Sequence, residues 1–305
     1  MTRREFMRRA LTLGLAAYGV SELGGIAGLE GLPPAEGAAG PTVVVASKRD
    51  PAGLVRAAVE ALGGMRKFVK RGATVLVKPN IAWARKPEQA ATTNPEVVAE
   101  IVRLCKQAGA REVKVMDHAV DRADALILRM SGIKAAAEKA GARVSMASSA
   151  ALYEKVQLRR AKVLKSTEVL RDLRRADVFI NVPIAKVHGQ TDVTLGCKNL
   201  MGTAFDRGSW HGSASLDQCI ADFAAEFRPD LVILDAVRIL LSNGPKGPGR
   251  TESPGIVAAG TDPLAVDAYG TTLLGQQAQR VEHLRRAYEM GVGEIDLERV
   301  KVKHV

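Results

Sequence analysis

Residues 177–202 read DVFINVPIAKVHGQTDVTLGCKNLMG, and the first part of this stretch decides the class of fold. Asp177–Val182 is a run of mostly apolar residues, which predicts a strand with both faces buried. Pro183 ends the run, because proline has no backbone N–H to donate to a neighbouring strand. Strands buried on both faces are typical of parallel sheets that have helices packed on each side.

The same alternation of apolar runs and helical stretches continues on both sides of this strand. Further strands are predicted at residues 42–47, 73–78, 112–116, 143–146, 230–235 and 256–260. Helices are predicted between them at residues 51–70, 96–108, 131–139, 216–227 and 262–274. Asp50-Pro51 and Asn94-Pro95 each place a capping side chain before a proline at the first helical position. The pattern predicts an α/β fold with a mainly parallel sheet flanked by helices, as one domain or as two α/β lobes.

Two segments do not follow this alternation. Residues 147–176 are basic and lack a clear period, so we expect an irregular insertion or subdomain there. Residues 242–254, SNGPKGPGRTESP, are rich in glycine and proline and are expected to form a loop. The folded domain is therefore expected to span residues 41–305, with these two interruptions.

The first forty residues resemble an export signal. Thr2-Arg3-Arg4-Glu5-Phe6 is followed by a short apolar run, Ala10–Val20, and by small residues as far as Gly40. Two adjacent arginines, with phenylalanine two positions later, resemble the twin-arginine motif. We therefore expect the twin-arginine translocation machinery as a partner and a periplasmic or other extracytoplasmic location. A signal that stays attached would tether the protein to the membrane, and an amphipathic first helix is the alternative.

The chain is basic, with a net charge of +11 from 44 lysines and arginines against 33 acidic residues. Residues 1–40 contain four arginines and four glutamates, so the charge excess belongs to residues 41–305. Such an excess favours anionic partners. Aromatic residues make up only 4%, which argues against stacking platforms for nucleic acid. The basic segment 159–175 is expected to face solvent or anionic lipid head groups, so membrane-surface association stays open and nucleic acid is not expected.

The cysteine content limits the kinds of cofactor. No two of Cys105, Cys197 and Cys219 have the CxxC spacing. Neither a zinc ribbon nor a ferredoxin-type iron–sulfur loop is therefore expected. The expected export route carries folded proteins, so a bound cofactor of unknown identity stays open.

Polar side chains follow several predicted strands at the point where each strand ends. Lys78 and Asn80 follow the second strand, Asp117 and His118 follow the third, and Asp235 ends a later one. The carboxyl ends of parallel strands form one edge of a sheet, and ligands bind there. We therefore expect ammonium, amide, imidazole and carboxylate groups to meet at this edge.

The densest group of polar residues lies in the second half of the stretch quoted first. Lys186 and His188 are two residues apart, so in an extended segment their side chains share a face. Thr194, Lys198 and Asn199 follow at spacings that fit a helical turn. Ammonium groups suit a phosphate or carboxylate, and an imidazole titrates near neutral pH. We expect an anionic small molecule here, with the two lysines and His188 in catalytic roles and His188 as general base or metal ligand.

Other polar residues give weaker expectations. Asp117 and His118 precede two further carboxylates, Asp121 and Asp124, and such a set could hold a metal ion. A polar loop that caps the next helix explains the same residues.

Three other histidines are expected either to have no role in the site or, for one of them, to belong to a loop that covers it. His211 lies next to Trp210 in a loop rich in glycine and serine, which fits either a lid over the site or an ordinary ordered loop. His283 and His304 lie in the basic C-terminal region and are expected to face solvent.

These motifs resemble the domain of unknown function 362 family over about residues 42–275. The resemblance rests on Val77-Lys78-Pro79-Asn80, Lys186-x-His188, Thr194-x-x-x-Lys198-Asn199-x-x-Gly202, Asn243-Gly244-Pro245-x-Gly247 and Thr261-Asp262-Pro263-x-Ala265-x-Asp267. It adds Asp267 to the candidate ligand-binding residues. Many members carry an extra ferredoxin-like segment with clustered cysteines and are labelled iron–sulfur proteins, but this chain lacks that segment. The lysine-containing segment is also distantly similar to nickel-pincer lactate racemases, in which a lysine holds the cofactor and histidines transfer protons; here it contains one histidine.

Two functions stay open at the level of sequence. In the first, an exported enzyme binds an anionic small molecule with Lys78, Lys186 and Lys198 and moves protons with His188. In the second, the same site carries a ligand or cofactor without chemistry, as a binding or maturation protein of the cell envelope. An iron–sulfur electron-transfer protein is a third interpretation, which the cysteine count disfavours.

Overall fold

The computed structural model describes residues 40–212 and 215–305. Residues 41–305 form one compact unit. The expected export signal therefore lies outside the described residues. Among the helices that are described, none is both long enough and apolar enough to span a bilayer.

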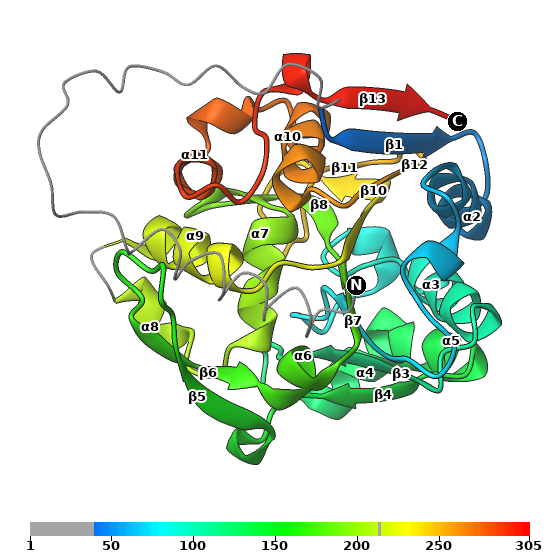
Figure 1. The fold of residues 1–305 in the computed structure, drawn as a ribbon, viewed down its shortest axis with the longest axis horizontal. Helices are drawn as coiled ribbons and strands as arrows, with labels where there is room; N and C mark the ends of the chain where they lie inside the picture. Colours follow the sequence, from blue (N-terminus) through cyan, green and yellow to red (C-terminus); the bar gives the residue numbers. More distant parts are fainter. Residues whose placement is uncertain (1–39, 213–214) are drawn as a thin grey trace, which may run out of the picture. The chain divides into compact units, whose positions relative to one another are not determined.

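One mixed sheet of 11 strands organises residues 41–305 (Figure 1). Five neighbouring strands are parallel, in the order β10 (Leu231–Leu240), β7 (Val178–Val182), β2 (Thr74–Pro79), β3 (Glu112–Asp117) and β4 (Arg143–Met146). Beyond β10 the sheet continues with β12 (Ile256–Gly260), β1 (Thr42–Ser47) and β13 (Lys301–His304). The predicted α/β fold with a mainly parallel sheet is confirmed, as one sheet rather than two lobes.

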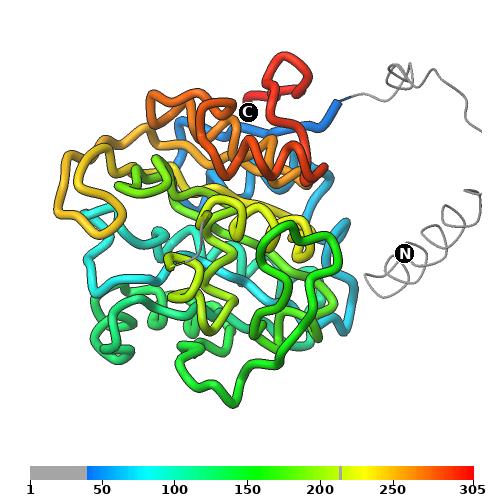
Figure 2. Tube along the Cα trace, turned by 90° about the vertical axis from the view of Figure 1, so that its left-hand side faces the viewer, coloured from blue at the N-terminus to red at the C-terminus, as the bar shows by residue number. Residues whose placement is uncertain are grey.

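The strand β12 runs against its neighbours. It pairs antiparallel with both β10 and β1, although a parallel strand was expected there. Residues 241–255, which join β10 to β12, contain no helix and include the short strand β11 (Thr251–Glu252), which turns back along β10. Parallel neighbours need a long crossover connection, whereas a chain that returns directly reverses its direction. The parallel pairing of β13 with β1 closes this side, and Figure 2 shows the red C-terminal trace beside the blue β1.

Helices cover both faces of the sheet, and each face has its own hydrophobic core. Over one face lie α2 (Pro51–Ala61), α3 (Pro95–Gln107), α4 (Asp124–Ser131) and α5 (Ile133–Lys139). Over the other lie α7 (Gly196–Asn199), α9 (Leu216–Glu226), α10 (Pro263–Leu273) and α11 (Glu282–Glu289). In β2, Val75 and Val77 belong to the first core and Leu76 to the second. This double burial is why the strands are continuous apolar runs in the sequence.

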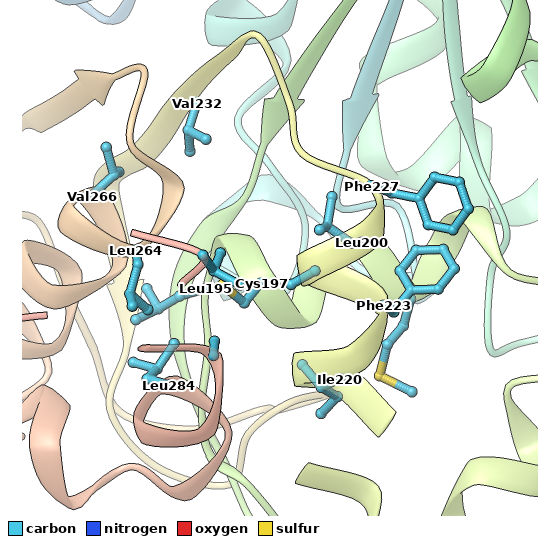
Figure 3. Packing of buried hydrophobic residues seen from close by; sticks show 14 of the residues in the cluster. Leu195, Cys197, Leu200, Ile220, Phe223, Phe227, Val232, Leu264, Val266 and Leu284 are labelled. Carbon is cyan, nitrogen blue, oxygen red and sulfur yellow. The ribbon is translucent and has the colours of Figure 1, made fainter. Parts of the chain in front are cut away.

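The second core brings together segments that are far apart in the chain. Figure 3 shows Leu195 and Cys197 near α7, with Ile220 of α9, Leu264 of α10 and Leu284 of α11 around them. All five side chains are buried. The C-terminal helix α11 is thus packed beside the segment that carries the candidate site residues.

Residues 147–176 are not irregular, contrary to the prediction. They contain an antiparallel pair, β5 (Tyr153–Gln157) with β6 (Ser166–Leu170), followed by the short helix α6 (Arg171–Arg175). Alternate residues of β5 face solvent, so its apolar content is too low to stand out in the sequence. Tyr153 and Leu170 attach the hairpin to the second core.

Helical segments differ from the prediction in two places. The helix predicted at residues 131–139 is α5, which begins after Gly132, whose φ of 69° is left-handed; the preceding helix α4 was not predicted. Short 3₁₀ helices also occur, namely η1 (Met65–Lys67), η2 (Pro87–Gln89), η3 (Ala150–Leu152), η4 (Leu200–Thr203), η5 (Ala278–Arg280) and η6 (Leu297–Arg299).

The candidate site segment continues past the proline that ends β7. Two further strands, β8 (Ile184–His188) and β9 (Asp192–Thr194), form an antiparallel pair on β10, and α7 and η4 follow at once. A short helix, α8 (Gly208–His211), precedes α9. The site residues are therefore held by strands and helix turns rather than by a free loop.

Candidate functional site

A buried ion pair joins the ends of two neighbouring parallel strands. Nζ of Lys78, in β2, lies 2.9 Å from Oδ1 of Asp117, at the end of β3. The two side chains are almost completely buried. Asp117 also accepts hydrogen bonds from the backbone N–H groups of Ile81, at 2.6 Å, and His118, at 2.9 Å. The carboxylate expected as a metal ligand is thus fully engaged with a lysine and two amides.

A chain of side-chain amides extends from this pair. Oδ1 of Asn199 accepts from Nζ of Lys78, at 2.8 Å, and from Nδ2 of Asn80, at 2.9 Å. Nδ2 of Asn199 donates to Oδ1 of Asn181 at 2.8 Å, and Asn181 donates to the carbonyl of Gly196 at 2.9 Å. Asn181 was not among the residues predicted for the site. Its position inside an otherwise apolar strand was the signal for it, because a buried amide needs partners.

Lys186 reaches the same network from β8. Its Nζ donates to Oδ1 of Asn80 at 3.0 Å and to the carbonyl of Ala91 at 2.6 Å. Only 1% of the residue is exposed, and both acceptors are uncharged. Burial, and next the nearby Lys78 ammonium, lower the pKa of Lys186 to about 7. Lys186 is therefore a buried amine that titrates close to neutral pH.

Lys198 is the third buried lysine. It belongs to α7, and the hydrogen bond found for its Nζ among the described residues runs to Sδ of Met201, at 3.6 Å. Thioether sulfur is a weak acceptor. Burial lowers the pKa of Lys198 to about 8, although Asp217 acts in the opposite direction. This ammonium group has no strong partner in the described part of the structure.

Arg207 adds a fourth cation, which is half-buried and was not predicted from the sequence. Nη2 donates to the carbonyl of Ala119 at 2.6 Å, whereas Nη1 is buried and has no hydrogen-bond partner among the described residues. Arg207 also acts on the pKa values of Lys78 and Lys198, which places all three in one electrostatic environment.

Both carboxylate oxygens of Asp267 are used to hold the backbone of α7, so they are not free to contact a ligand. Its Oδ1 accepts from the backbone N–H of Gly196 at 2.6 Å and its Oδ2 from that of Cys197 at 2.7 Å. These bonds hold the first turn of α7, which carries Lys198 and Asn199. Burial raises the pKa of Asp267 to about 6.

Gly202, in η4, leaves the space that the Lys78–Asp117 ion pair occupies. A Cβ at this position would lie 1.9 Å from Oδ1 of Asp117 and 2.7 Å from Nζ of Lys78. No side chain fits there without displacing the ion pair. This contact explains why a glycine stands at the end of the Lys-Asn-x-x-Gly motif.

His188 lies at the end of β8, on the same face as Lys186. Its Nδ1 accepts from the backbone N–H groups of Gln190, at 3.1 Å, and Thr191, at 3.3 Å. Burial, and next the Lys198 ammonium, lower the pKa of His188 to about 3. The ring is therefore neutral at pH 7 and carries its proton on Nε2. This geometry favours a hydrogen-bond donor over the general base expected from the sequence.

Thr194 is the last candidate of this segment. In the pairing of β8 with β9 it stands opposite Lys186, and its Oγ1 is buried without a hydrogen-bond partner among the described residues. Buried hydroxyl groups normally have partners, so this oxygen is available to a ligand.

Asp235 lies away from the lysines. Its Oδ2 accepts from the backbone N–H of Asn94 at 2.7 Å and its Oδ1 from that of Val237 at 3.0 Å, which fixes the start of α3. It contributes to the wall of a cavity of about 510 Å³ together with Thr92 and Arg238. Burial raises the pKa of Asp235 to about 6.

The proposed metal ligands are not brought together. His118 stacks on Phe205, with ring centres 5.5 Å apart, and Asp121 and Asp124 bond to Lys246 and Ser148 respectively. Within residues 40–212 and 215–305, no group of three or more histidine, cysteine, aspartate or glutamate residues has an arrangement that could hold a metal ion.

The C-terminal histidines differ from each other. His304 is exposed in β13, as predicted, whereas the prediction that His283 faces solvent is wrong, because α11 packs this ring against α9. Trp210 is buried against Phe223, with ring centres 5.3 Å apart, and His211 is exposed.

The arrangement concentrates positive charge in a buried volume. Lys78, Lys186, Lys198 and Arg207 are close enough to affect one another's pKa values, and Asp117 is the carboxylate that bonds directly to one of them. Burying charges without partners is unfavourable by several kcal/mol per ion. The cluster therefore has the charge and the free donors to hold an anion.

Known proteins with similar sequence and structure place the chain among its relatives. Residues 75–272 match the model of the domain of unknown function DUF362. A thylakoid-associated protein of Synechocystis sp. is 31% identical over 233 residues, which cover 72% of this chain and 68% of that protein.

Two solved structures are similar at low sequence identity. The lactate racemase apoprotein of Thermoanaerobacterium thermosaccharolyticum has a TM-score of 0.48 and 12% identity, over 77% of this chain and 57% of its own. A protein of Thermotoga maritima has a TM-score of 0.46 and 11% identity, over 76% of this chain and 61% of its own. The chain thus spans less than two thirds of each of these structures. The match to residues 75–272 and the curated relative together show that the chain belongs to the DUF362 family, the domain of unknown function 362.

Proposed function

We propose that the chain binds a small anionic molecule in the buried cluster of Lys186, Lys198 and Arg207. One observation carries this proposal: two buried lysines and the half-buried Arg207 have donor groups whose partners are uncharged, weak or missing among the described residues. A bound carboxylate, phosphate or sulfate would supply the missing negative charge and accept from these donors.

Each part of the cluster has a distinct role in this binding. Lys186 and Lys198 supply charge, and Nη1 of Arg207 and Oγ1 of Thr194 supply hydrogen bonds. Lys78 is already paired with Asp117, so it orients Asn199 and holds the network rather than contacting the ligand. The amide chain fixes the position of Lys186, because its Nζ bonds directly to Asn80.

His188 acts as a neutral donor in this proposal. Its Nδ1 is committed to two backbone N–H groups, which leaves the Nε2–H to face a ligand. A base with a pKa of about 3 takes up almost no protons at neutral pH. Lys186, with a pKa of about 7, is better placed to gain or lose a proton when the anion binds.

The binding proposal is tested by calorimetric titration of the purified chain with sulfate, inorganic phosphate and malonate. We expect at least one of these anions to bind with a dissociation constant below about 1 mM, which corresponds to about 4 kcal/mol. Lys198→Met should weaken binding at least tenfold. Lys139→Met removes an exposed lysine far from the cluster in the sequence and should leave the affinity unchanged. Equal weak binding by all three proteins would mean that only surface charge attracts the anion.

The ligand that the protein carries when isolated from its own cells separates an enzyme from a carrier. A ligand that remains bound in stoichiometric amount and is recovered unchanged would indicate the non-catalytic binding or maturation role. Conversion of the recovered ligand would indicate catalysis, and native mass spectrometry of protein isolated from its own cells identifies the molecule in either case.

We further propose that residues 1–40 direct export by the twin-arginine translocation machinery. The paired arginines Arg3 and Arg4 support this proposal. Replacement of both by lysine should retain the full-length protein in the cytoplasm, as measured by cell fractionation. Unchanged distribution between fractions would contradict it, and a membrane fraction released only by detergent would indicate a retained signal.

A further inference from the structure

A buried imidazole lies beside the cationic cluster in a part of the chain outside the family match. His283 belongs to α11, beyond residue 272, where that match ends. The residue is 0% exposed; among the described residues Nε2 has no hydrogen-bond partner, and Nδ1 has only a long contact with Asp217, at 3.5 Å. Buried polar groups without partners destabilise the folded state by about 1–3 kcal/mol. A residue of this kind is expected where a ligand completes the bonding.

Asp217 is the acidic group next to this ring. Nδ1 of His283 lies 3.5 Å from Oδ1 of Asp217, in α9, and the Asp217 side chain is 23% exposed. The two helices pack along each other, and Arg286 of α11 donates to Oε1 of Gln218 at 2.8 Å. Because an ionised carboxylate only accepts hydrogen bonds, Asp217 favours a proton on Nδ1. The lone pair of Nε2 is then free.

The groups that act on His283 belong to the elements of the site. Burial lowers its pKa most; Asp217 then raises it and Lys198 lowers it, and Asp192 of β9 also raises it. The net direction is downward, so the ring is neutral in the absence of a ligand at pH 7. His283 in turn acts on His188, and Asp217 acts on Lys198. The imidazole, the carboxylate and the Lys198 ammonium therefore share one buried environment, while Arg285 and Arg286 of the same helix are paired with Glu282.

We propose that His283, held by Asp217, exchanges a proton with the anion bound at Lys198. The inference rests on the proposed function, since it needs an anion in the cluster. Nε2 of the neutral ring takes a proton from an acidic group of the bound anion, while Nδ1 keeps its own proton. Asp217 stabilises the imidazolium that forms, and Lys198 stabilises the additional negative charge on the ligand. Return of the proton restores both groups.

This assignment gives the half-buried His188 and the buried His283 different functions. Nδ1 of His188 is occupied by two backbone donors, so its proton sits on Nε2 and the ring donates to the ligand. His283 has the complementary arrangement, with an acidic neighbour at Nδ1 and a free acceptor at Nε2. One ring is a fixed donor and the other is a proton acceptor.

The test is nitrogen-15 NMR of the histidine side chains, recorded across pH with and without saturating sulfate. Sulfate is the probe because it does not titrate near neutral pH. We expect His283 to be the neutral Nδ1–H tautomer at pH 7 without sulfate. Sulfate should raise its pKa by at least about one unit, because an anion near the ring favours the imidazolium. The pKa of exposed His304 should move less, and His304→Asn identifies its signals.

Asp217→Asn removes the charge next to His283 but keeps the shape of the side chain. Because the Asp217 side chain is partly exposed, we expect this variant to fold. Its sulfate affinity should stay within about threefold of the wild type, because Lys186 and Lys198 remain. The variant should lose the preference for the Nδ1–H tautomer, and the pKa of His283 should fall, since the carboxylate that favours the imidazolium is gone.

The outcomes separate the inference from the proposed function. If calorimetry shows bound sulfate but the His283 signals do not move, or if the ring is the Nε2–H tautomer, the inference is wrong and anion binding stands. If sulfate, phosphate and malonate all fail to bind the wild-type protein, the proposed function fails, and the role of His283 fails with it.

Discussion

Lys186→Met is expected to stabilise the folded protein below pH 7 while weakening anion binding. The pKa of Lys186 falls from 10.5 to about 7, first through burial and then through the Lys78 ammonium. At about 1.4 kcal/mol per pKa unit, this change means that charged Lys186 lowers the free energy of unfolding by roughly 5 kcal/mol relative to neutral Lys186. The variant leaves the carbonyl oxygens of Asn80 and Ala91 without their donor, which costs about 2 kcal/mol. We therefore expect the variant to be about 3 kcal/mol more stable at pH 6.

The sign of this difference reverses at high pH. Between pH 7 and 10.5 the unfolded chain binds the Lys186 proton and the folded chain does not, so the stability of the wild type rises with pH. At pH 10 the folded wild type holds Lys186 as a neutral amine, so the cost of burying its charge is nearly gone. The variant has lost two hydrogen bonds and should then be less stable than the wild type by about 1 kcal/mol. Only a buried lysine with a strongly lowered pKa produces this crossing.

Urea unfolding at pH 6, 8 and 10 measures the free energies of unfolding of both proteins. Lys139→Met is the matched control, and its difference from the wild type should be small at each pH. A variant that is less stable than the wild type at pH 6, with a difference that does not change with pH, would refute the view that Lys186 is a buried charge kept for ligand binding.

Three further predictions concern residues that shape the site. Gly202→Ala should lower the free energy of unfolding by about 3 kcal/mol, because the new Cβ forces apart the buried Lys78–Asp117 pair; Gly208→Ala, with open space around it, should change urea unfolding little. Asp267→Asn should weaken sulfate binding about tenfold in calorimetry, since the first turn of α7 loses one of its two carboxylate acceptors; an unchanged affinity would show that α7 needs no such support. Arg207→Met should weaken sulfate binding about tenfold without loss of stability, because Nη1 is a buried donor without a partner among the described residues; a stability loss above about 2 kcal/mol would indicate a structural role instead.

The parallel half of the fold was predictable because burial on both faces leaves a continuous apolar signal. Asp177–Val182 is such a run, and the strands β2, β3 and β10 are others. The reversed direction of β12 was not predictable from its own residues, since direction depends on the connection before it. The hairpin of β5 and β6 was missed because β5 has a single buried residue, Tyr153, and the surrounding segment is basic.

The candidate site was predictable where a motif and a strand end coincide. Lys78, Lys186, Asn80 and Asn199 were expected to meet, and they share one hydrogen-bond network. Asp235 was expected with them but bonds instead to the backbone N–H groups of Val237 and of Asn94, the residue that caps α3; the sequence does not show these backbone contacts.

The missed residues come from segments with no distinguishing local pattern. Arg207 lies in an irregular segment, and His283 lies in a helix whose other residues are mostly charged, so neither looked buried. His283 is buried because α11 packs against α9, whereas Arg207 is half-buried with only its Nη1 atom fully enclosed. Contacts of this kind are tertiary and leave no trace in a short window of sequence.

The most direct test of the central claim is the number of protons taken up when sulfate binds at pH 8. Calorimetric titrations in two buffers of different ionisation enthalpy give this number. With pKa values of about 7 for Lys186 and about 8 for Lys198, both lysines are partly neutral at pH 8, and an anion drives them to the ammonium form. We expect uptake of about 1.4 protons by the wild type, roughly 0.9 at Lys186 and 0.5 at Lys198, and of about 0.5 by Lys186→Met. Sulfate binding without proton uptake, or with the same uptake in both proteins, would contradict the account.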